Sequence, residues 1–191
     1  MSRLDLVVGP NGAGKTTLYQ RLIAPDRPGL PFVNADRIAH DRFPGQEVEQ
    51  GYAAAEIAAR TRQALIDARL DFCAETVFSH ESKVDLVVTA TAAGYDVVLH
   101  VVVIPLELSG PRVSLRVAAG GHDVPADKLA ARYERLWPLV VAALPACYRS
   151  VFYDNAVDQG PIEVAAFRFG IPDYAPRWPA WTPAPLLELN V

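Results

Sequence analysis

The chain has 191 residues and a net charge of −4, with 51% apolar and 21% charged residues. This length suits one domain with a sizeable core, and the composition is that of a soluble globular protein. A duplex nucleic-acid partner is not expected, because such binders usually show a basic surplus. A membrane partner is not expected either, because the longest apolar run, residues 97–104, is too short to span a bilayer.

Two cysteines, Cys73 and Cys147, lie outside any CxxC or His-rich pattern, so neither a zinc site nor a disulfide framework is indicated. This cysteine usage fits a reducing compartment. The apolar stretch at residues 4–8 lacks the length and cleavage site of a signal peptide. We therefore expect a cytoplasmic protein.

Short apolar runs alternate with amphipathic stretches along the chain. Strands are expected at residues 4–8, 31–35, 71–75, 95–104, 151–153 and 164–169, and helices at 14–23, 48–70, 82–93, 111–119 and 125–144. The last helix is expected to break at Pro138, which cannot donate a helical hydrogen bond. Apolar strands separated by helices predict an α/β fold with a mostly parallel, doubly wound sheet and helices on both faces. Residues 1–170 should form this single domain.

The tail, residues 171–191, has a different composition. It combines five prolines with Trp178 and Trp181. Prolines at this density favour an extended strap over a helix. The two tryptophans either attach the strap to the domain or dock a partner.

A phosphate-binding loop follows the first predicted strand. It matches G-x-x-x-x-G-K-[ST] with Gly9, Pro10, Asn11, Gly12, Ala13, Gly14, Lys15, Thr16 and Thr17. The preceding strand and following helix are the context that the motif requires. Glycines let backbone N–H groups converge on phosphate oxygens, and the helix adds its positive end. Lys15 can reach the β- and γ-phosphates and Thr16 can ligate Mg²⁺, so a P-loop NTPase fold that binds ATP and Mg²⁺ is predicted.

Other P-loop classes fit less well. There is no N-K-x-D motif, which a GTPase would use to read its base, and no apolar strand ending in Asp-Glu follows residues 108–110, as a transporter ATPase would need. The spacing favours a compact kinase of a nucleoside or metabolite.

Carboxylates follow the second and third predicted strands. Because ligands gather at the carboxyl ends of parallel strands, Asp36 and Glu75 should share one edge with Lys15. Asp36 could accept the proton of an attacking hydroxyl, or it could only cap a helix starting at Arg37. Glu75, with Thr76 beside it, could orient a substrate hydroxyl or hold the water shell of Mg²⁺.

Ser79 has two possible roles. It could contact the substrate, or it could cap a helix near Glu81.

Four arginines lie between residues 112 and 135. Arg112 and Arg116 share one helix face, which suits phosphate binding. On the next helix, Arg132 lies at the flank of the apolar stripe, which makes it a cleft candidate, whereas Arg135 lies nearly opposite. The alternative for all four is a solvated helix surface.

The ordered set of motifs resembles the short zeta-toxin proteins. The resemblance spans residues 3–170 and rests on the loop, Val33-Asn34-Ala35-Asp36, Glu75-Thr76, Arg112-x-x-x-Arg116, Gly120-Gly121-His122-Asp123-Val124-Pro125, Arg132-Tyr133 and Tyr153-Asp154-Asn155. It implies an ATP- and Mg²⁺-dependent kinase that phosphorylates a hydroxyl of UDP-N-acetylglucosamine. It also implies a separate antitoxin chain as a partner.

The resemblance also implies roles for residues. Asp36 would be the base, Lys15 would bind the γ-phosphate, and Arg116 would stabilise the transferred charge, while Glu75 and Thr76 would face the substrate. Longer family members carry a second active-site arginine, and here that neighbourhood holds His122. Arg132 or Arg112 substitutes for it, or His122 takes part of its role.

Two alternatives to a zeta-toxin-like kinase remain. One is a housekeeping metabolite kinase that resembles shikimate or gluconate kinases. The other is a nucleotide-sensing module with slow ATPase activity that signals through its tail.

Overall fold

The computed structural model describes residues 1–118, 125–157 and 159–189. Its strands are β1 (Ser2–Val8), β2 (Phe32–Asn34), β3 (Phe72–Thr76), β4 (Tyr95–Val103), β5 (Arg149–Asp154), β6 (Ile162–Arg168) and β7 (Ile171–Pro172). Its helical segments are α1 (Lys15–Leu18), η1 (Tyr19–Ile23), α2 (Ala35–Arg42), α3 (Gly51–Asp67), α4 (Ser82–Ala92), α5 (Leu106–Ala118), α6 (Ala126–Ala143), η2 (Leu144–Ala146) and α7 (Ala184–Leu187). The predicted α/β class is confirmed.

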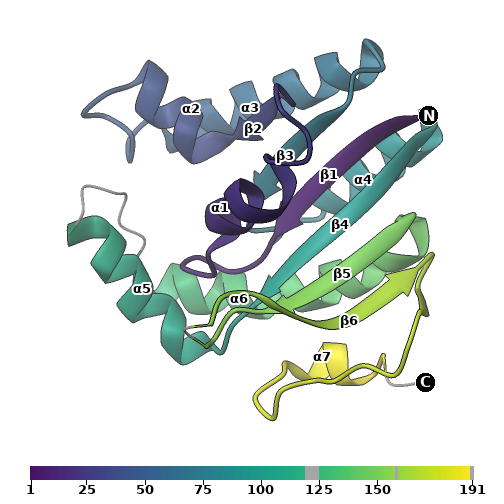
Figure 1. Cartoon of the computed structure of the whole chain (residues 1–191). Helices are drawn as coiled ribbons and strands as arrows, with labels where there is room; N and C mark the ends of the chain where they lie inside the picture. The colour runs from purple at the N-terminus through teal and green to yellow at the C-terminus, as the bar shows by residue number, and fades with distance from the viewer. Residues whose placement is uncertain (119–124, 158, 190–191) are drawn as a thin grey trace.

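One sheet organises the molecule, with strand order β2-β3-β1-β4-β5-β6-β7 (Figure 1). The first five strands in this order are parallel, whereas β6 and β7 add antiparallel at one edge. In the register, Val8 lies opposite both Thr76 and Val101, and Asn34 lies opposite Glu75. The carboxyl ends of β1, β2 and β3 therefore meet at one edge of the sheet.

Both faces of the sheet are covered, as predicted. Because side chains alternate along a strand, Leu6 and Val8 point to one face while Val7 points to the other. The first face forms the larger core with residues of α3, α4 and α6, including Trp137. The second face packs on α1, η1 and the start of α5, and Leu18 of α1 is buried there. Figure 1 shows α1 in front of the sheet and α4 and α6 behind it.

Two helix predictions are wrong in their boundaries. Helix α6 does not break at Pro138. Leu136 and Val140, on either side of the proline, are fully buried, so packing offsets the one hydrogen bond that Pro138 cannot donate. Helix α5 begins at Leu106 and not at Pro111, because its first turn already packs Leu106 against the core.

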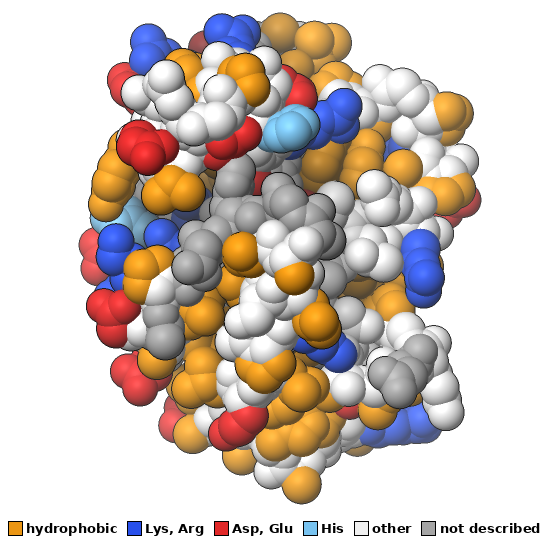
Figure 2. All heavy atoms as spheres, turned by 90° about the vertical axis from the view of Figure 1, so that its left-hand side faces the viewer, with side chains coloured by type: hydrophobic (Ala, Val, Ile, Leu, Met, Phe, Trp, Pro, Cys, Tyr) orange, Lys and Arg blue, Asp and Glu red, His pale blue; other side chains and the backbone are white. Residues whose placement is uncertain are grey.

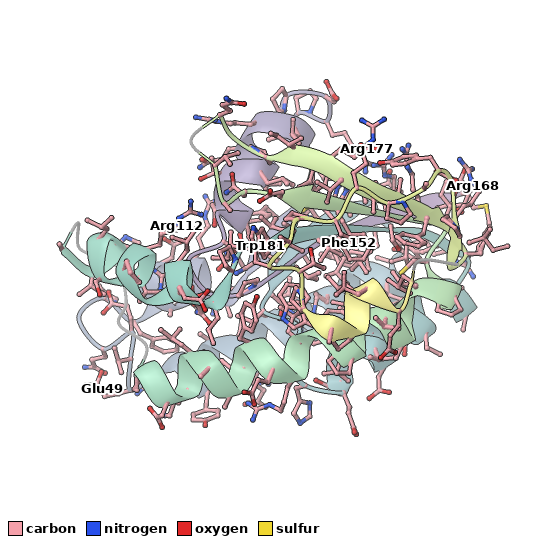
Figure 3. All side chains as sticks on the ribbon, turned by 90° about the horizontal axis from the view of Figure 1, so that it is seen from below. Glu49, Arg112, Phe152, Arg168, Arg177 and Trp181 are labelled. Carbon is pink, nitrogen blue, oxygen red and sulfur yellow. The ribbon has the colours of Figure 1, made fainter. Side chains whose placement is uncertain are left out.

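The tail lies along the domain. Trp178 meets the ring of Phe152 edge-on, with centroids 5.3 Å apart, and Leu186 of α7 is fully buried in the larger core. The backbone N–H of Arg177 donates a 2.7 Å hydrogen bond to the carbonyl of Val164 in β6. Figure 3 shows this strap, with α7 on the side of the sheet that α6 covers.

Within the described ranges, no helix is long and apolar enough to cross a bilayer.

Candidate functional site

The loop after β1 has the backbone conformation that its glycines allow. Gly14 has φ +86°, and a Cβ there would lie 2.5 Å from Nδ2 of Asn155. The same Nδ2 donates a 2.7 Å hydrogen bond to the carbonyl of Ala13, and Nη1 of Arg112 donates to the carbonyl of Asn155 at 2.8 Å. Residues from the end of β5 and from α5 thus hold the loop in place (Figure 3 labels Arg112).

Lys15 lies inside this loop and is 8% exposed. Its Nζ donates to the carbonyl of Pro10 at 2.9 Å. Burial lowers the pKa of Lys15, and the charges of Glu75 and Asp36 oppose that shift. The ammonium therefore lies within electrostatic reach of both predicted carboxylates.

Thr16 and Glu75 form a pair of hard oxygen donors. The Thr16 hydroxyl donates a 2.8 Å hydrogen bond to Oε2 of Glu75, at the end of β3. Among the described residues, no cluster of three or more His, Cys, Asp or Glu side chains could hold a metal alone. Such a sparse oxygen set fits Mg²⁺, which keeps several waters and binds through one or two protein oxygens plus substrate phosphates. Thr16 and Glu75 are the residues that would hold it.

Asp36 is not the cap of its helix. Helix α2 starts at Ala35, and its N-cap is Asn34, whose Oδ1 accepts a 3.0 Å hydrogen bond from the N–H of Arg37. The Asp36 side chain is 63% exposed and its Oδ2 lies 3.8 Å from Nη1 of Arg116. The capping alternative is therefore excluded, and the carboxylate faces the cleft.

Two adjoining cavities open at the carboxyl edge of the sheet, and both are lined by Asn34, Asp36, Glu75 and Arg116. The first, of about 580 Å³, also contacts Thr16 and the stacked rings of Tyr19 and Phe32. The second, of about 400 Å³, extends between the loop, the end of β3, α3 and α4. We call it the α3 cavity. Figure 2, which faces this edge, shows acidic and basic side chains interspersed and not one continuous basic stripe.

Eight of the predicted site residues come together in the α3 cavity. Its lining includes Asn11, Lys15, Asp36, Glu75, Thr76, Ser79, Arg116 and Arg132. Arg112 is not part of this lining, since it contacts the loop from the side of α5. His122 lies outside the described residues.

The side chain of Arg135 is exposed, as predicted for a surface charge. Its Nε nonetheless donates a 3.3 Å hydrogen bond to the carbonyl of Ser79.

Sequence reasoning missed Arg62, which also lines the α3 cavity. It lies in α3 and is only 7% exposed. The signal was present in the spacing, because Ala54, Ala58, Arg62 and Ile66 recur every four residues and form the buried face of this helix. Arg62 therefore lies on the buried face of α3, whereas charged residues of a helix usually lie on its solvated face.

The loop geometry, the parallel order β2-β3-β1-β4-β5 and the converging carboxylates define the class of P-loop nucleotide-binding proteins. The model of one family within this class, AAA_33 (AAA domain), matches residues 4–139. This match covers more than half of the chain, so the chain belongs to the AAA_33 family. No curated protein matches it in sequence.

Solved structures share the fold at low identity. A chain of AvrRxo1-ORF1:-ORF2 crystallised with ATP is 18% identical, with a TM-score of 0.71, and the match covers 91% of this chain and 60% of that one. A chain of the PezAT chromosomal toxin-antitoxin system of Streptococcus pneumoniae is 16% identical, with a TM-score of 0.61 and coverages of 85% and 71%. Shikimate kinase from Acinetobacter baumannii is 18% identical, with a TM-score of 0.54 and coverages of 84% and 86%. This protein thus spans about 60% of the AvrRxo1-ORF1:-ORF2 chain and has a P-loop kinase-like fold.

Proposed function

We propose that this protein transfers the γ-phosphoryl group of ATP to a hydroxyl of a small molecule bound in the α3 cavity. The observation that carries the proposal is the convergence of Lys15, Asp36 and Arg116 on this one cavity. A passive nucleotide-binding loop needs the lysine alone. A kinase also needs a base for the acceptor and a cation for the charge that moves.

Each residue has a role that follows from its position. The loop N–H groups and Lys15 hold the phosphates, and Asp36 accepts the proton of the attacking hydroxyl. The hydroxyl oxygen forms a bond to the γ-phosphorus, the bond to the β–γ bridging oxygen breaks, and ADP leaves. Arg116, with Arg132 beside it in the cavity lining, stabilises the negative charge on the transferred group. When bound, Mg²⁺ supplies charge neutralisation at the phosphates.

The acceptor that we propose first is a nucleotide sugar such as UDP-N-acetylglucosamine, on the motif resemblance to zeta toxins. The fold similarity to a chain of the PezAT toxin-antitoxin system agrees with this choice and supports a separate antitoxin chain as the partner. In that case Glu75, Thr76 and Ser79 would contact the sugar.

A second candidate is a metabolite kinase. The similarity to shikimate kinase covers 86% of that enzyme, so this chain matches its size more closely than it matches the AvrRxo1-ORF1:-ORF2 chain. The α3 cavity, at about 400 Å³, can hold a small acid as well as part of a nucleotide sugar.

The test is a transfer reaction with ATP, Mg²⁺ and a panel that includes UDP-N-acetylglucosamine, shikimate and gluconate. Mass spectrometry should detect one acceptor that has gained a phosphoryl group. Lys15→Ala should abolish the product, whereas Arg21→Ala, which removes an exposed cation from the adjoining segment η1, should not. Steady ADP release that no acceptor stimulates would favour the nucleotide-sensing module. Full transfer by a folded Lys15→Ala variant would exclude a P-loop kinase.

A further inference from the structure

Arg62 and Lys83 are two of the cations that line the α3 cavity and have no role in the proposed transfer reaction. Arg62 of α3 is buried, with 7% of its surface exposed. Lys83 is half-buried in the first turn of α4. Within the described part of the chain, neither forms an ion pair, and the one hydrogen bond of Lys83 is a 3.4 Å contact with the hydroxyl of Ser82. A buried guanidinium is costly unless an anion or a set of acceptors compensates it.

The electrostatics of Arg62 agrees with the lack of an ion pair among the described residues. Burial lowers the pKa of Arg62, and no carboxylate of the described part of the chain opposes the shift. Burial also lowers the pKa of Lys83, and the second cause is repulsion by Arg62 itself. Arginine remains charged under all physiological conditions. Two like charges are therefore held near each other at the surface of a cavity.

These cations form a group distinct from those at the phosphate-binding loop. The charges that act on Lys15 are Glu75, Asp36, Arg116 and Arg132, and Arg62 is not among them. The proposed reaction assigns Lys15, Arg116 and Arg132 to the phosphates. Arg62 and Lys83 are available to a different anion.

The face of α3 that lines the cavity leads from the cleft to Arg62. Its lining residues include Gly51, Ala55, Ala58 and Arg62, at spacings that place them on one side of the helix. Small side chains leave room beside the helix, and the rise from Gly51 to Arg62 is roughly 16 Å at 1.5 Å per residue. Asp36 and Arg62 both line this cavity, so one acceptor can contact the carboxylate and the guanidinium together.

We propose that Arg62 and Lys83 form an anion-binding subsite of the α3 cavity, so that the acceptor carries a carboxylate or phosphate group away from the hydroxyl that receives the phosphoryl group. This inference rests on the proposed function, since it specifies the chemical class of that acceptor. The planar guanidinium of Arg62 donates two parallel hydrogen bonds to the anion, and Lys83 adds a point charge. Neutral sugars and polyols are excluded as good acceptors.

The test uses the full chain saturated with Mg²⁺ and a non-hydrolysable ATP analogue, so that the phosphate-binding loop is filled. Calorimetry then measures binding of pyrophosphate and, separately, of shikimate, which present a diphosphate and a carboxylate. Wild type should bind at least one probe. Arg62→Gln should weaken that binding by about 10- to 100-fold, the effect of losing a charge-assisted hydrogen-bond pair. Lys83→Gln should weaken it less.

Arg60→Gln is the matched control. Arg60 lies in the same helix, but its side chain is 71% exposed and pairs with Glu56 at 3.0 Å, so anion binding should not change. Thermal melting without ligand separates a ligand-binding role from a structural one. Because Arg62 is buried and forms no ion pair with the described residues, Arg62→Gln should leave Tm unchanged or raise it.

The probes decide the source of the anion. Selective binding of pyrophosphate supports an acceptor with a diphosphate, as in a nucleotide sugar, and selective binding of shikimate supports a small carboxylic acid. Binding of the ATP analogue without binding of either probe would overturn the subsite and leave the kinase proposal standing. Equal probe affinity in Arg62→Gln and wild type, or a marked fall in Tm in that variant, would also overturn it. Failure to bind the ATP analogue would overturn both proposals.

Discussion

Asp36→Asn should separate catalysis from stability. The substitution keeps the shape of the side chain and removes its capacity to accept a proton. We expect kcat to fall about 10²-fold or more, the usual contribution of a general base, with the affinity for ATP little changed.

The structural cost of this substitution should be small. Asp36 is 63% exposed, and its 3.8 Å ion pair with the 39% exposed Arg116 stabilises the fold by at most about 1 kcal/mol. The cap of α2 is Asn34 and stays intact. For a chain of this size, 1 kcal/mol corresponds to about 2–4 °C in Tm. A typical domain would remain almost fully folded, so unfolding cannot explain a hundredfold loss of rate.

The assay follows acceptor-dependent ADP release, with the acceptor found in the panel, together with thermal melting. Asp41→Asn is the control, because Asp41 lies on the same helix, is 59% exposed and makes a similar 3.8 Å ion pair with Arg37. It should match Asp36→Asn in Tm and wild type in kcat. If Asp36→Asn turns over within a few-fold of wild type, the carboxylate is not the base and the proposed role of Asp36 fails.

Four further substitutions test other parts of the site and fold. Arg116→Ala should lower kcat by about 10²-fold with little effect on ATP affinity. Arg135 is exposed, so Arg135→Ala should leave the steady-state kinetics nearly unchanged. An equal fall in kcat in both variants would show that Arg116 is not the cation of the site. Gly14→Ala should weaken nucleotide binding measured by calorimetry, because its methyl group would enter occupied space at φ +86°, and unchanged affinity would argue against a rigid loop. For Asp5, burial alone would raise the pKa, but hydrogen bonds led by that from His100 outweigh burial and lower it. A carboxylate with a lowered pKa stabilises the fold above about pH 4, and this stability is lost as pH falls through the folded-state pKa. Asp5→Asn should therefore narrow the difference in urea midpoint between pH 7 and pH 3. An unchanged difference would contradict this linkage.

The strands were predictable because burial on two faces requires long apolar runs. Each of the six predicted strands has a counterpart, and the observed bounds differ by a few residues at most. Strand β7, Ile171–Pro172, was not predicted, since two residues carry no periodicity and their pairing with β6 depends on tertiary contact. The same limit explains Pro138, where local propensity predicts a break and core packing maintains the helix.

The candidate site was predictable wherever a local pattern marks a chemical role. The loop motif and the acidic residues after β2 and β3 are such patterns, and the structure brings Lys15, Asp36 and Glu75 to one cavity. Arg112 looks equivalent to Arg116 in the sequence, and only the fold shows that it hydrogen-bonds the carbonyl of Asn155. Arg62 carries no motif. The four-residue spacing in α3 indicates that it is buried, but only the fold shows that it lines the cavity and has no ion pair among the described residues.

The position of the tail has a consequence for how the molecule is made. Residues 178–186 contribute Trp178 and Leu186 to the same core that the first strand enters through Leu4 and Leu6. During synthesis the phosphate-binding loop leaves the ribosome early, but the part of the larger core that Trp178 and Leu186 cover stays exposed until the tail has been translated. Premature termination before residue 178 would release chains that carry the whole nucleotide motif and an unsealed apolar surface. Such fragments would be substrates for chaperones and proteases, so quality control would remove the truncated chains.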